Sequence, residues 1–532
     1  MRQLNTIARG FLSPPVLLST VWALILVIIL IGPIHYPSLP SMSTFLLIVV
    51  GLVLFSCAHC AGAWSFARSL GPGLRQSATP EVLNLTVGAA SIAGLVGIAL
   101  IALDRTVFSG MSNSDRAALL RCAPALVDFI QIKRTPLLYL GYLSFSFGFV
   151  SLALFLLRGE DIKGWAVYPA QLSILSPVGY AILYSGRMPI LLMLALILSV
   201  VVVRLAWRLP PLPRGHHLLV KVMVVSVLFG VYVNAMWSSR QNSCAEMEAV
   251  VRELQTAKEQ HSDNRQSLPK RAKPIEKIEA LRKRSDAADE VEANNVKETL
   301  VPSNSPQLGI DAARVSKMFE DVRPRVASAG APEVGPFLNN MRQSWKVAPR
   351  QYVVSAHEAG YLSSSAFRAL LSNHFYLTHG VRTLGVIWQS RAELSPSWGV
   401  YEIGILSPIS RIFFPANQLL TTMNNELIKA DIYGFFPTVW GAALVDFGAW
   451  GAAIYIVFWG FCGGWAYCGT TRSTLVTPPL LLTFTIASIV LSPIQGPLGI
   501  SNSALVLLSM LTIGGIVDTC TLRDKPRTDV ST

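Results

Sequence analysis

Charged residues are scarce in this chain of 532 residues. Asp, Glu, Lys and Arg make up 14% of it, against about 25% in an ordinary soluble domain, and 52% of the residues are hydrophobic. This composition argues against a water-soluble enzyme and against a disordered chain. Apolar runs of about 20 residues, the length that crosses the hydrocarbon core of a bilayer, recur along the sequence. The sequence therefore predicts an all-α polytopic membrane protein.

Cysteine is also rare. The chain has 7 cysteines, an odd number without the spacing of a disulfide framework. Cys57 and Cys60 resemble a redox or metal pair, but they stand within a predicted membrane span. We interpret them as buried packing residues, because cysteine in an apolar run behaves as a small hydrophobic side chain.

The net charge of +13 raises the question of a nucleic acid partner. No basic stripe interleaved with stacking aromatic residues occurs outside the apolar runs. Lys and Arg are retained in the cytoplasmic loops of membrane proteins, which accounts for the excess of positive charge. We therefore expect a lipid bilayer, and not a nucleic acid, as the partner of this chain.

Ten transmembrane helices are predicted, at residues 15–34, 42–64, 82–103, 136–157, 165–184, 189–207, 218–237, 449–468, 478–497 and 502–519. The basic residues that flank these spans fall on one side if both termini are cytoplasmic, as the positive-inside rule requires. The loop 104–135 is the exception, since it holds five basic residues on the opposite side.

The predicted topology places residues 238–435 outside the membrane. The sequence divides into transmembrane helices 1–7 (1–237), a polar, flexible insertion (238–347), an external region of short helices that carries the active site (348–435), transmembrane helices 8–10 (436–520) and a cytoplasmic tail (521–532). The insertion is too polar to form a good core, whereas aromatic and apolar residues return after residue 348.

Arg187 is the first candidate site residue. It follows Ser185 and Gly186 in a tight break between two apolar spans, and the stretch 165–203 has no other charge. We do not expect an arginine in such a place to face lipid. It either snorkels to the interface or anchors a phosphate through its planar guanidinium, and we favour the phosphate anchor.

His379 and Arg382 form the second candidate. On a helix they stand at i,i+3, so the pair could bind an anion or the histidine could act as a base. His374 and His379 stand at i,i+5, which suits zinc poorly. An interfacial helix with snorkelling polar side chains is the alternative.

Asp446 and Arg411 complete the candidates. Asp446 is a lone carboxylate at the outer mouth of a helix with many glycines, which permit close helix contact, and it serves either as a helix cap or as a base. Arg391 and Arg411 could form ordinary surface salt bridges with Glu393 and Glu402, which contribute little to stability. The apolar context of Arg411 makes it the more interesting of the two arginines.

These motifs resemble those of bacterial oligosaccharide repeat-unit polymerases, the Wzy-type O-antigen polymerase family. The resemblance covers roughly residues 165–500. It rests on the Ser-Gly-Arg turn (185–187), a large external loop with Tyr-Leu-Thr-His-Gly (376–380), a Gly-x-x-x-Pro segment that leads to an arginine (404–411), and an aromatic-Pro-Thr to Asp-Phe-Gly-x-x-Gly helix with a glycine-rich end (436–464).

The resemblance implies a glycosyltransferase of the bacterial inner membrane with the fold of the O-antigen ligases. Such an enzyme transfers a glycan from undecaprenyl diphosphate to the non-reducing end of another lipid-linked unit at the periplasmic face, in O-antigen or exopolysaccharide synthesis. It needs no cofactor, and a flippase and a chain-length regulator are its expected partners.

The resemblance also suggests roles for the candidate residues. Arg187, Arg382 and Arg411 would hold the substrate diphosphate. His379 is the first candidate for the base, and Asp446 is the second. The alternatives are an O-antigen ligase, which shares the donor, a polysaccharide flippase or transporter, and a membrane scaffold.

Overall fold

The computed structural model describes most of the apolar helices and part of the external region. The residues described are 12–37, 40–69, 79–108, 115, 130–131, 135–184, 186, 188–207, 209–213, 223–224, 227–228, 310–311, 334–343, 345–403, 406, 419–430, 432, 434, 436–499 and 502–523.

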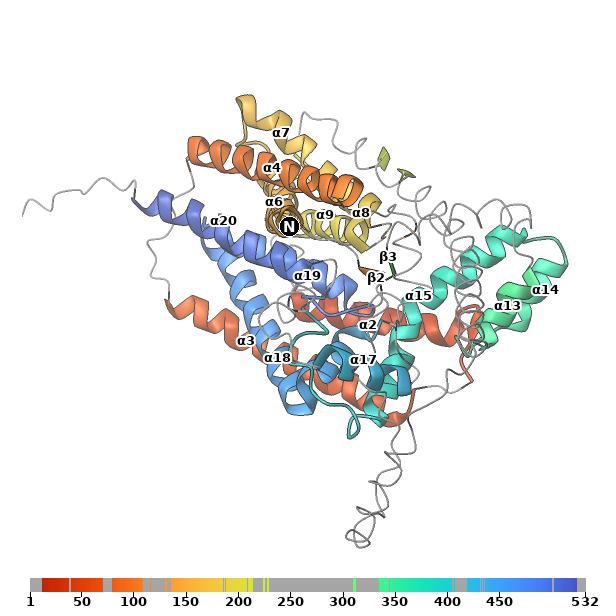
Figure 1. Cartoon of the computed structure of the whole chain (residues 1–532). Coiled ribbons are helices and arrows are strands. Elements are labelled where there is room, and N and C mark those ends of the chain that lie inside the picture. Colours follow the sequence, from red (N-terminus) through yellow and green to blue (C-terminus); the bar gives the residue numbers. More distant parts are fainter. Residues whose placement is uncertain are drawn as a thin grey trace, which may run out of the picture. The chain divides into compact units, whose positions relative to one another are not determined.

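Helices dominate the described residues (Figure 1). Their bounds are α2 Pro14–Ile31, α3 Met42–Ser69, α4 Pro80–Leu103, the π-helix η1 Asp104–Phe108, α6 Pro136–Arg158, the 3₁₀-helix η3 Gly164–Ala166, α7 Val167–Leu172, α8 Leu175–Leu183, α9 Met188–Ala206, α13 Val334–Gln343, α14 Gln351–Glu358, α15 Ser364–Gln389, α17 Leu419–Lys429, α18 Thr438–Arg472, α19 Thr477–Leu491 and α20 Ser503–Arg523. The strands are β1 Ile34–His35, β2 Ile130–Gln131, β3 Ile310–Asp311 and β4 Ala348–Pro349.

Eight helices in the described ranges are long and apolar enough to cross a membrane. They coincide with predicted spans, so the expectation of a polytopic helical membrane protein is confirmed at this level. The span predicted at 478–497 is the shorter helix α19, which ends at Leu491. The span predicted at 218–237 lies almost wholly outside the described residues.

The chain forms two compact units. One comprises Met1–Phe108, Arg134–Trp237 and Ala331–Thr532, and the other comprises Ser109–Lys133 and Ser238–Gly330. In the second unit, the parallel pair β2–β3 joins the two segments. Of the predicted insertion at 238–347, the described residues are 310–311, 334–343 and 345–347, and Val334–Gln343 form helix α13.

In the first unit, the end of α2, the start of α18 and the end of α19 lie together. Strand β1, which follows α2, pairs antiparallel with β4, which precedes α14. His374 Nε2 of α15 lies 3.1 Å from the carbonyl oxygen of Ile28. The N–H of Val439 donates to the carbonyl oxygen of Ser492 over 2.9 Å. We call this end of the bundle, where α13–α15 also lie (Figure 1), the pocket end.

The opposite end joins the last turns of α6, α9 and α18. Arg204, fully buried in α9, donates to the carbonyl oxygen of Leu157 over 2.7 Å and forms an ion pair with Glu160. Trp207 Nε1 donates to the carbonyl oxygen of Thr470 over 2.5 Å. An arginine at a helix C-terminus satisfies carbonyl groups that have no partner within the helix.

Trp207 lies beside the C-terminal end of α18, whereas Thr438 begins α18 at the pocket end. The span at 218–237 stays a prediction.

Helices α3 and α18 pack closely through glycines, as the sequence predicted for the glycine-rich end of α18. A Cβ atom on Gly464 would lie 1.9 Å from the carbonyl oxygen of His59, and one on Gly62 would lie 2.0 Å from that of Phe461. Neither position tolerates a side chain without moving a helix backbone. Small residues of this kind let membrane helices approach and gain dispersion energy.

Gly464→Ala should therefore destabilise the protein, by about 1–3 kcal/mol as overpacked cores do. Gly515→Ala in α20 is the matched control, because a Cβ atom there meets nothing within 4 Å. Thermal unfolding in detergent measures both variants. Equal midpoints for Gly464→Ala and the wild type would contradict the close packing.

Helix α18 bends at Gly448. This residue has φ 64° and ψ −173° inside a helix of 35 residues, a backbone conformation that favours glycine. The bend separates a first segment from a longer apolar one, and the predicted span 449–468 begins directly after it. The first segment, which contains Asp446, is thus helical, although no span was predicted there.

Two sequence interpretations change in the structure. Arg105, one of the five basic residues of the predicted loop 104–135, is only 8% exposed and belongs to η1. Cys57 and Cys60, taken for buried residues, are exposed on α3, where an apolar helix face would contact lipid.

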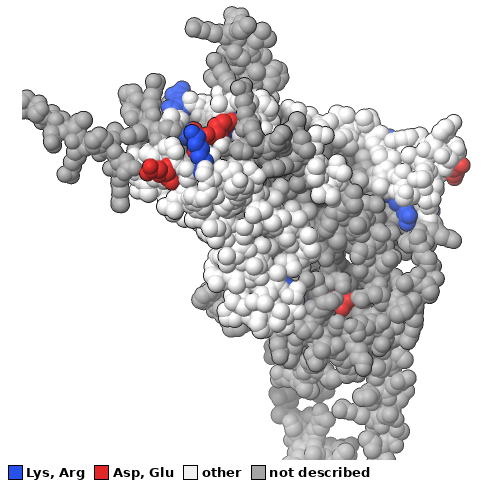
Figure 2. Space-filling view, turned by 90° about the horizontal axis from the view of Figure 1, so that it is seen from above, with Lys and Arg blue, Asp and Glu red and all other residues white. Residues whose placement is uncertain are grey.

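The surface of the described residues fits a membrane protein. On the face shown in Figure 2, the charged side chains of the described residues gather mainly toward two opposite ends, and few lie on the described surface between them. A band of this kind is expected where helices contact hydrocarbon. The structure thus supports a helical protein embedded in a membrane.

Candidate functional site

Helix α15 carries most of the polar side chains at the pocket end. Ser363 caps its N-terminus by accepting a hydrogen bond from the N–H of Ala366 over 3.2 Å. With 26 residues, it is longer than the short helices predicted for 348–435. Histidines and threonines interrupt its apolar run, so hydropathy does not predict a long helix here. Neighbouring elements hydrogen-bond these side chains instead.

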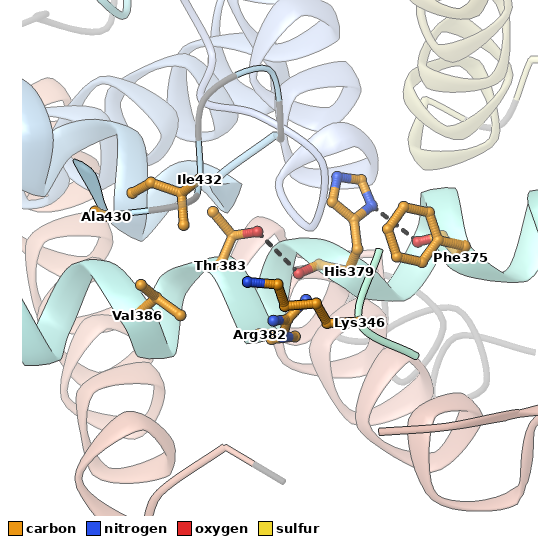
Figure 3. Close-up of a pocket in the computed structure, with 8 residues that line it drawn as sticks. All are labelled: Lys346, Phe375, His379, Arg382, Thr383, Val386, Ala430 and Ile432. Atoms are coloured by element: carbon orange, nitrogen blue, oxygen red, sulfur yellow. Dashed lines mark hydrogen bonds between the residues drawn. The ribbon is translucent and has the colours of Figure 1, made fainter. Parts of the chain in front are cut away.

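A pocket of about 110 Å³ opens beside this helix. It is lined by Lys346, Phe375, His379, Arg382, Thr383, Val386, Ala430 and Ile432. Figure 3 shows that α15 supplies most of these residues and that Ala430 and Ile432 enter from the end of α17 and the chain after it. One water needs roughly 10–15 Å³, so the pocket has room for a larger polar group such as a phosphoryl group.

Two cationic side chains line the pocket. Arg382 Nη1 donates to the carbonyl oxygen of Trp345 over 2.7 Å, which fixes one edge of the guanidinium. Lys346, the next residue after Trp345, is exposed and brings a second positive charge. The ion pairs between described residues do not include Arg382. The pocket is therefore suited to an anion.

Stacked rings form one wall of the pocket. The ring of Phe375 stacks on Trp345 at 4.2 Å and on His379 at 4.8 Å, measured between ring centroids. Phe375 and His379 lie one helical turn apart on α15, so their rings share a face. The stack holds the chain around Lys346 against α15. It thereby brings the lysine to the arginine.

His379, the first candidate for a base, is buried with both ring nitrogens engaged. Nδ1 lies 2.8 Å from the carbonyl oxygen of Phe375 and therefore donates to it. Nε2 accepts the N–H of Phe436 over 3.2 Å. Burial lowers the pKa of His379 to about 4. In this arrangement the imidazole cannot accept a proton from a substrate, and it ties the start of α18 to α15.

The pH dependence of activity tests the role of His379. With a pKa of about 4, the imidazole stays neutral above pH 5, so it should contribute no step to a rate profile between pH 5 and 8. His379→Gln should lower thermal stability while leaving the shape of that profile unchanged. An acidic limb that is present in the wild type and absent in the variant would instead identify His379 as the base.

Asp446, the second candidate, is fully buried and holds a loop. Its carboxylate accepts hydrogen bonds from Ser397 Oγ (2.5 Å), from the N–H of Tyr401 (3.0 Å) and from the N–H of Glu402 (2.6 Å). It therefore binds residues 397–402 to α18 and does not cap the helix that follows it. Both oxygens are occupied, so this geometry favours a structural role over that of a base.

Glu402 departs most from its sequence interpretation. It is fully buried and is not a surface salt-bridge partner. Its Oε1 accepts hydrogen bonds from the Tyr455 hydroxyl and the N–H of Leu498, each 3.0 Å long, while Oε2 is buried without a partner. Burial raises the pKa of Glu402 to about 7. Nothing in its surroundings in sequence signals this burial.

His374 faces away from the pocket, toward α2 and β1. Its Nε2 is at the carbonyl oxygen of Ile28, and Thr378, one turn later, bonds the Tyr36 hydroxyl over 2.5 Å. Burial lowers the pKa of His374. In the described part of the chain, no group of three or more His, Cys, Asp or Glu side chains is arranged to hold a metal ion.

The structure brings together only some of the predicted site residues. His379 and Arg382 line one pocket, and Asp446 lies in the first segment of α18, away from that lining. Arg187 and Arg411 lie outside the described residues. Lys346 and Thr383 also line the pocket and were not among the predicted site residues. Lys346 stands at the boundary between polar and aromatic sequence, where no periodic pattern marks it.

No family model, no curated protein and no solved structure matches this chain.

Proposed function

We propose that the protein is a metal-independent glycosyltransferase that polymerises lipid-linked oligosaccharide repeat units. It transfers a glycan from undecaprenyl diphosphate to the non-reducing end of a second lipid-linked unit. The observation that supports this most is the pocket lined by Arg382 and Lys346, which lies beside the ends of apolar helices. A cationic pocket at the edge of a membrane suits the phosphorylated head of a lipid.

The chemistry of the donor explains the need for cations. When the acceptor hydroxyl bonds to the anomeric carbon, the bond from that carbon to the diphosphate oxygen breaks, and the diphosphate leaves with the electron pair. Fixed positive groups stabilise the developing charge, and arginine can do so with two parallel hydrogen bonds. Arg382 and Lys346 do this in our proposal, joined by Arg187 and Arg411.

The acceptor hydroxyl must also lose a proton. His379 and Asp446 were the candidates, but their hydrogen bonds leave neither free to take it in this conformation. Glycosyl transfer passes through a transition state with oxocarbenium character, in which departure of the leaving group is far advanced. We therefore assign the larger share of catalysis to stabilisation of the diphosphate, and in our proposal the hydroxyl proton passes to the departing diphosphate oxygen, directly or through water.

The proposal includes a location and partners. The protein would lie in the bacterial inner membrane with both termini in the cytoplasm, and the pocket end would face the periplasm. A flippase would supply the lipid-linked units, and a chain-length regulator would limit the polymer. Product made in the periplasm would enter O-antigen or exopolysaccharide.

A deletion strain tests the proposal and separates it from its runner-up. Loss of a polymerase leaves lipid A cores with a single repeat unit, whereas loss of an O-antigen ligase leaves cores with none. We expect the single-unit band in the deletion strain, a full ladder after complementation with the wild-type gene, and no ladder with Arg187→Ala. A full ladder from Arg187→Ala would remove that residue from the mechanism.

A further inference from the structure

The loop that follows α15 packs against α18 but exposes one large apolar side chain. Ser397, Gly399 and Val400 are buried, whereas Trp398 between them is 71% exposed. The N–H of Trp398 donates to the carbonyl oxygen of Asp446 over 2.9 Å. The backbone of the loop is therefore fixed to α18, while the indole ring is turned outward.

The backbone of Trp398 is strained. Its φ is 53°, a value that is a genuine outlier for a bulky residue. The hydrogen bonds that the Asp446 carboxylate accepts from Ser397 Oγ, the N–H of Tyr401 and the N–H of Glu402 hold the loop in this conformation. Residues kept in such conformations cluster at functional sites. The strain therefore points to a role for the outward indole.

Exposed apolar side chains continue along one face of α18. Trp450 is 87% exposed, and Ile454 and Phe458 are exposed as well. Their spacing of four residues places them on the same face of the helix, whereas Ala452 and Ile456 are buried. On a helix long and apolar enough to cross a membrane, a face of this kind contacts lipid.

The length of α18 after its bend places Trp450 near the boundary of the hydrocarbon. The helix ends at Arg472, which is exposed, and no charged residue stands between Trp450 and Arg472. At a rise of about 1.5 Å per residue, this stretch is about 33 Å long, close to the hydrocarbon thickness of about 30 Å. When Arg472 lies at one boundary, Trp450 therefore lies at the other.

Trp398 lies at nearly the same depth as Trp450. In an unbroken helix, the N–H of Trp450 donates to the carbonyl oxygen of Asp446, and the N–H of Trp398 donates to that same oxygen. The two residues thus lie within one helical turn of each other along the axis, about 5.4 Å. The headgroup region extends roughly 5–8 Å beyond the hydrocarbon, so it can hold both rings.

We propose that Trp398 and Trp450 form a membrane anchor in the headgroup region of the bilayer at the pocket end. Lipid is the occupant of this surface, because the surface continues into the lipid-facing side of α18. Tryptophan suits the interface, since its ring is apolar and its N–H is polar. Insertion of the Trp398 ring offsets the strain of its backbone and keeps the loop 397–402 at the membrane surface. The anchor does not depend on the proposed glycosyl transfer.

Fluorine NMR of the full chain in phosphatidylcholine nanodiscs tests the anchor. The 12 tryptophans are replaced biosynthetically by 5-fluorotryptophan, and Trp398→Phe and Trp450→Phe assign the two resonances. Both resonances should be lost when the lipid carries a nitroxide on the acyl carbon nearest the headgroup, and a water-soluble gadolinium chelate should broaden them less. The resonance of Trp22, which is fully buried, is the control and should keep more of its intensity with the labelled lipid.

Two results would overturn the anchor. Stronger broadening of the Trp398 resonance by the chelate than by the labelled lipid would mean that the indole lies in water. Persistence of that resonance with both reagents would mean that protein, such as a second copy of this chain, covers it. Trp398→Tyr supplies the assignment if Trp398→Phe does not fold. Neither result depends on turnover, so failure of the anchor leaves the proposed function intact.

Discussion

Replacing Arg382 with alanine should reduce the rate of glycosyl transfer by about 10²–10³-fold, the effect of removing one preorganised charge-stabilising group from an active site. Arg382 lines the pocket. Its Nη1 donates to the Trp345 carbonyl oxygen and so fixes one edge of the guanidinium. The loss should appear in kcat, since the diphosphate gains charge as the bond breaks. Release of undecaprenyl diphosphate by reconstituted protein measures it.

Arg391 provides a matched control on the same part of the chain. It also donates to a tryptophan carbonyl oxygen, that of Trp388, over 2.6 Å, and it stacks on that ring. It is exposed and does not line the pocket. Arg391→Ala should keep wild-type turnover. Equal losses in the two variants would mean that positive charge at this surface matters in general and that the pocket does not.

Raising the pH from 5 to 8 should destabilise the protein through Glu402. Burial raises the pKa of this carboxyl from 4.5 to about 7. Below pH 4.5 the group is protonated in both states; between 4.5 and 7 the folded state keeps a proton that the unfolded chain releases, so stability falls as the pH rises. At 1.36 kcal/mol per pKa unit, the full loss is roughly 3 kcal/mol and is complete above pH 7.

The change in unfolding midpoint with pH, measured in detergent, tests this prediction. Glu402→Gln removes the titrating group and should abolish most of the dependence. Asp446 also lies near this carboxyl, so some dependence should persist. Glu393→Gln, at an exposed carboxyl of the same segment, should behave as the wild type does. A wild-type midpoint that does not change between pH 5 and 8 would contradict the burial of an ionisable Glu402.

The helices could be predicted from the sequence because hydropathy alone determines which segments are long and apolar enough for a membrane. The same rule failed where polar side chains are satisfied by neighbours. Helix α15 escaped recognition as a long helix because His374, Thr378 and His379 lower its hydropathy. The bend at Gly448 agrees with the predicted start of the span 449–468, because this glycine with positive φ separates the two segments of α18.

The candidate site was accessible to sequence reasoning only in part. Arg382 and His379 stand in one short motif, so their common helix places them in one pocket. Lys346 lies 36 positions before Arg382 in the sequence. A stack of aromatic rings holds it at the pocket, and no periodic pattern in the sequence predicts that stack. The roles of His379 and Asp446 depend on long-range hydrogen bonds to Phe436 and to residues 397–402, which a sequence without homologues cannot reveal.

Purified protein, reconstituted in liposomes with lipid-linked repeat units and a metal chelator, tests the central claim most directly. We predict that the glycan lengthens while it stays attached to lipid, and that one undecaprenyl diphosphate is released for every bond formed. Absence of any lengthened lipid-linked product, or transfer only to added lipid A core, would contradict the proposed polymerase.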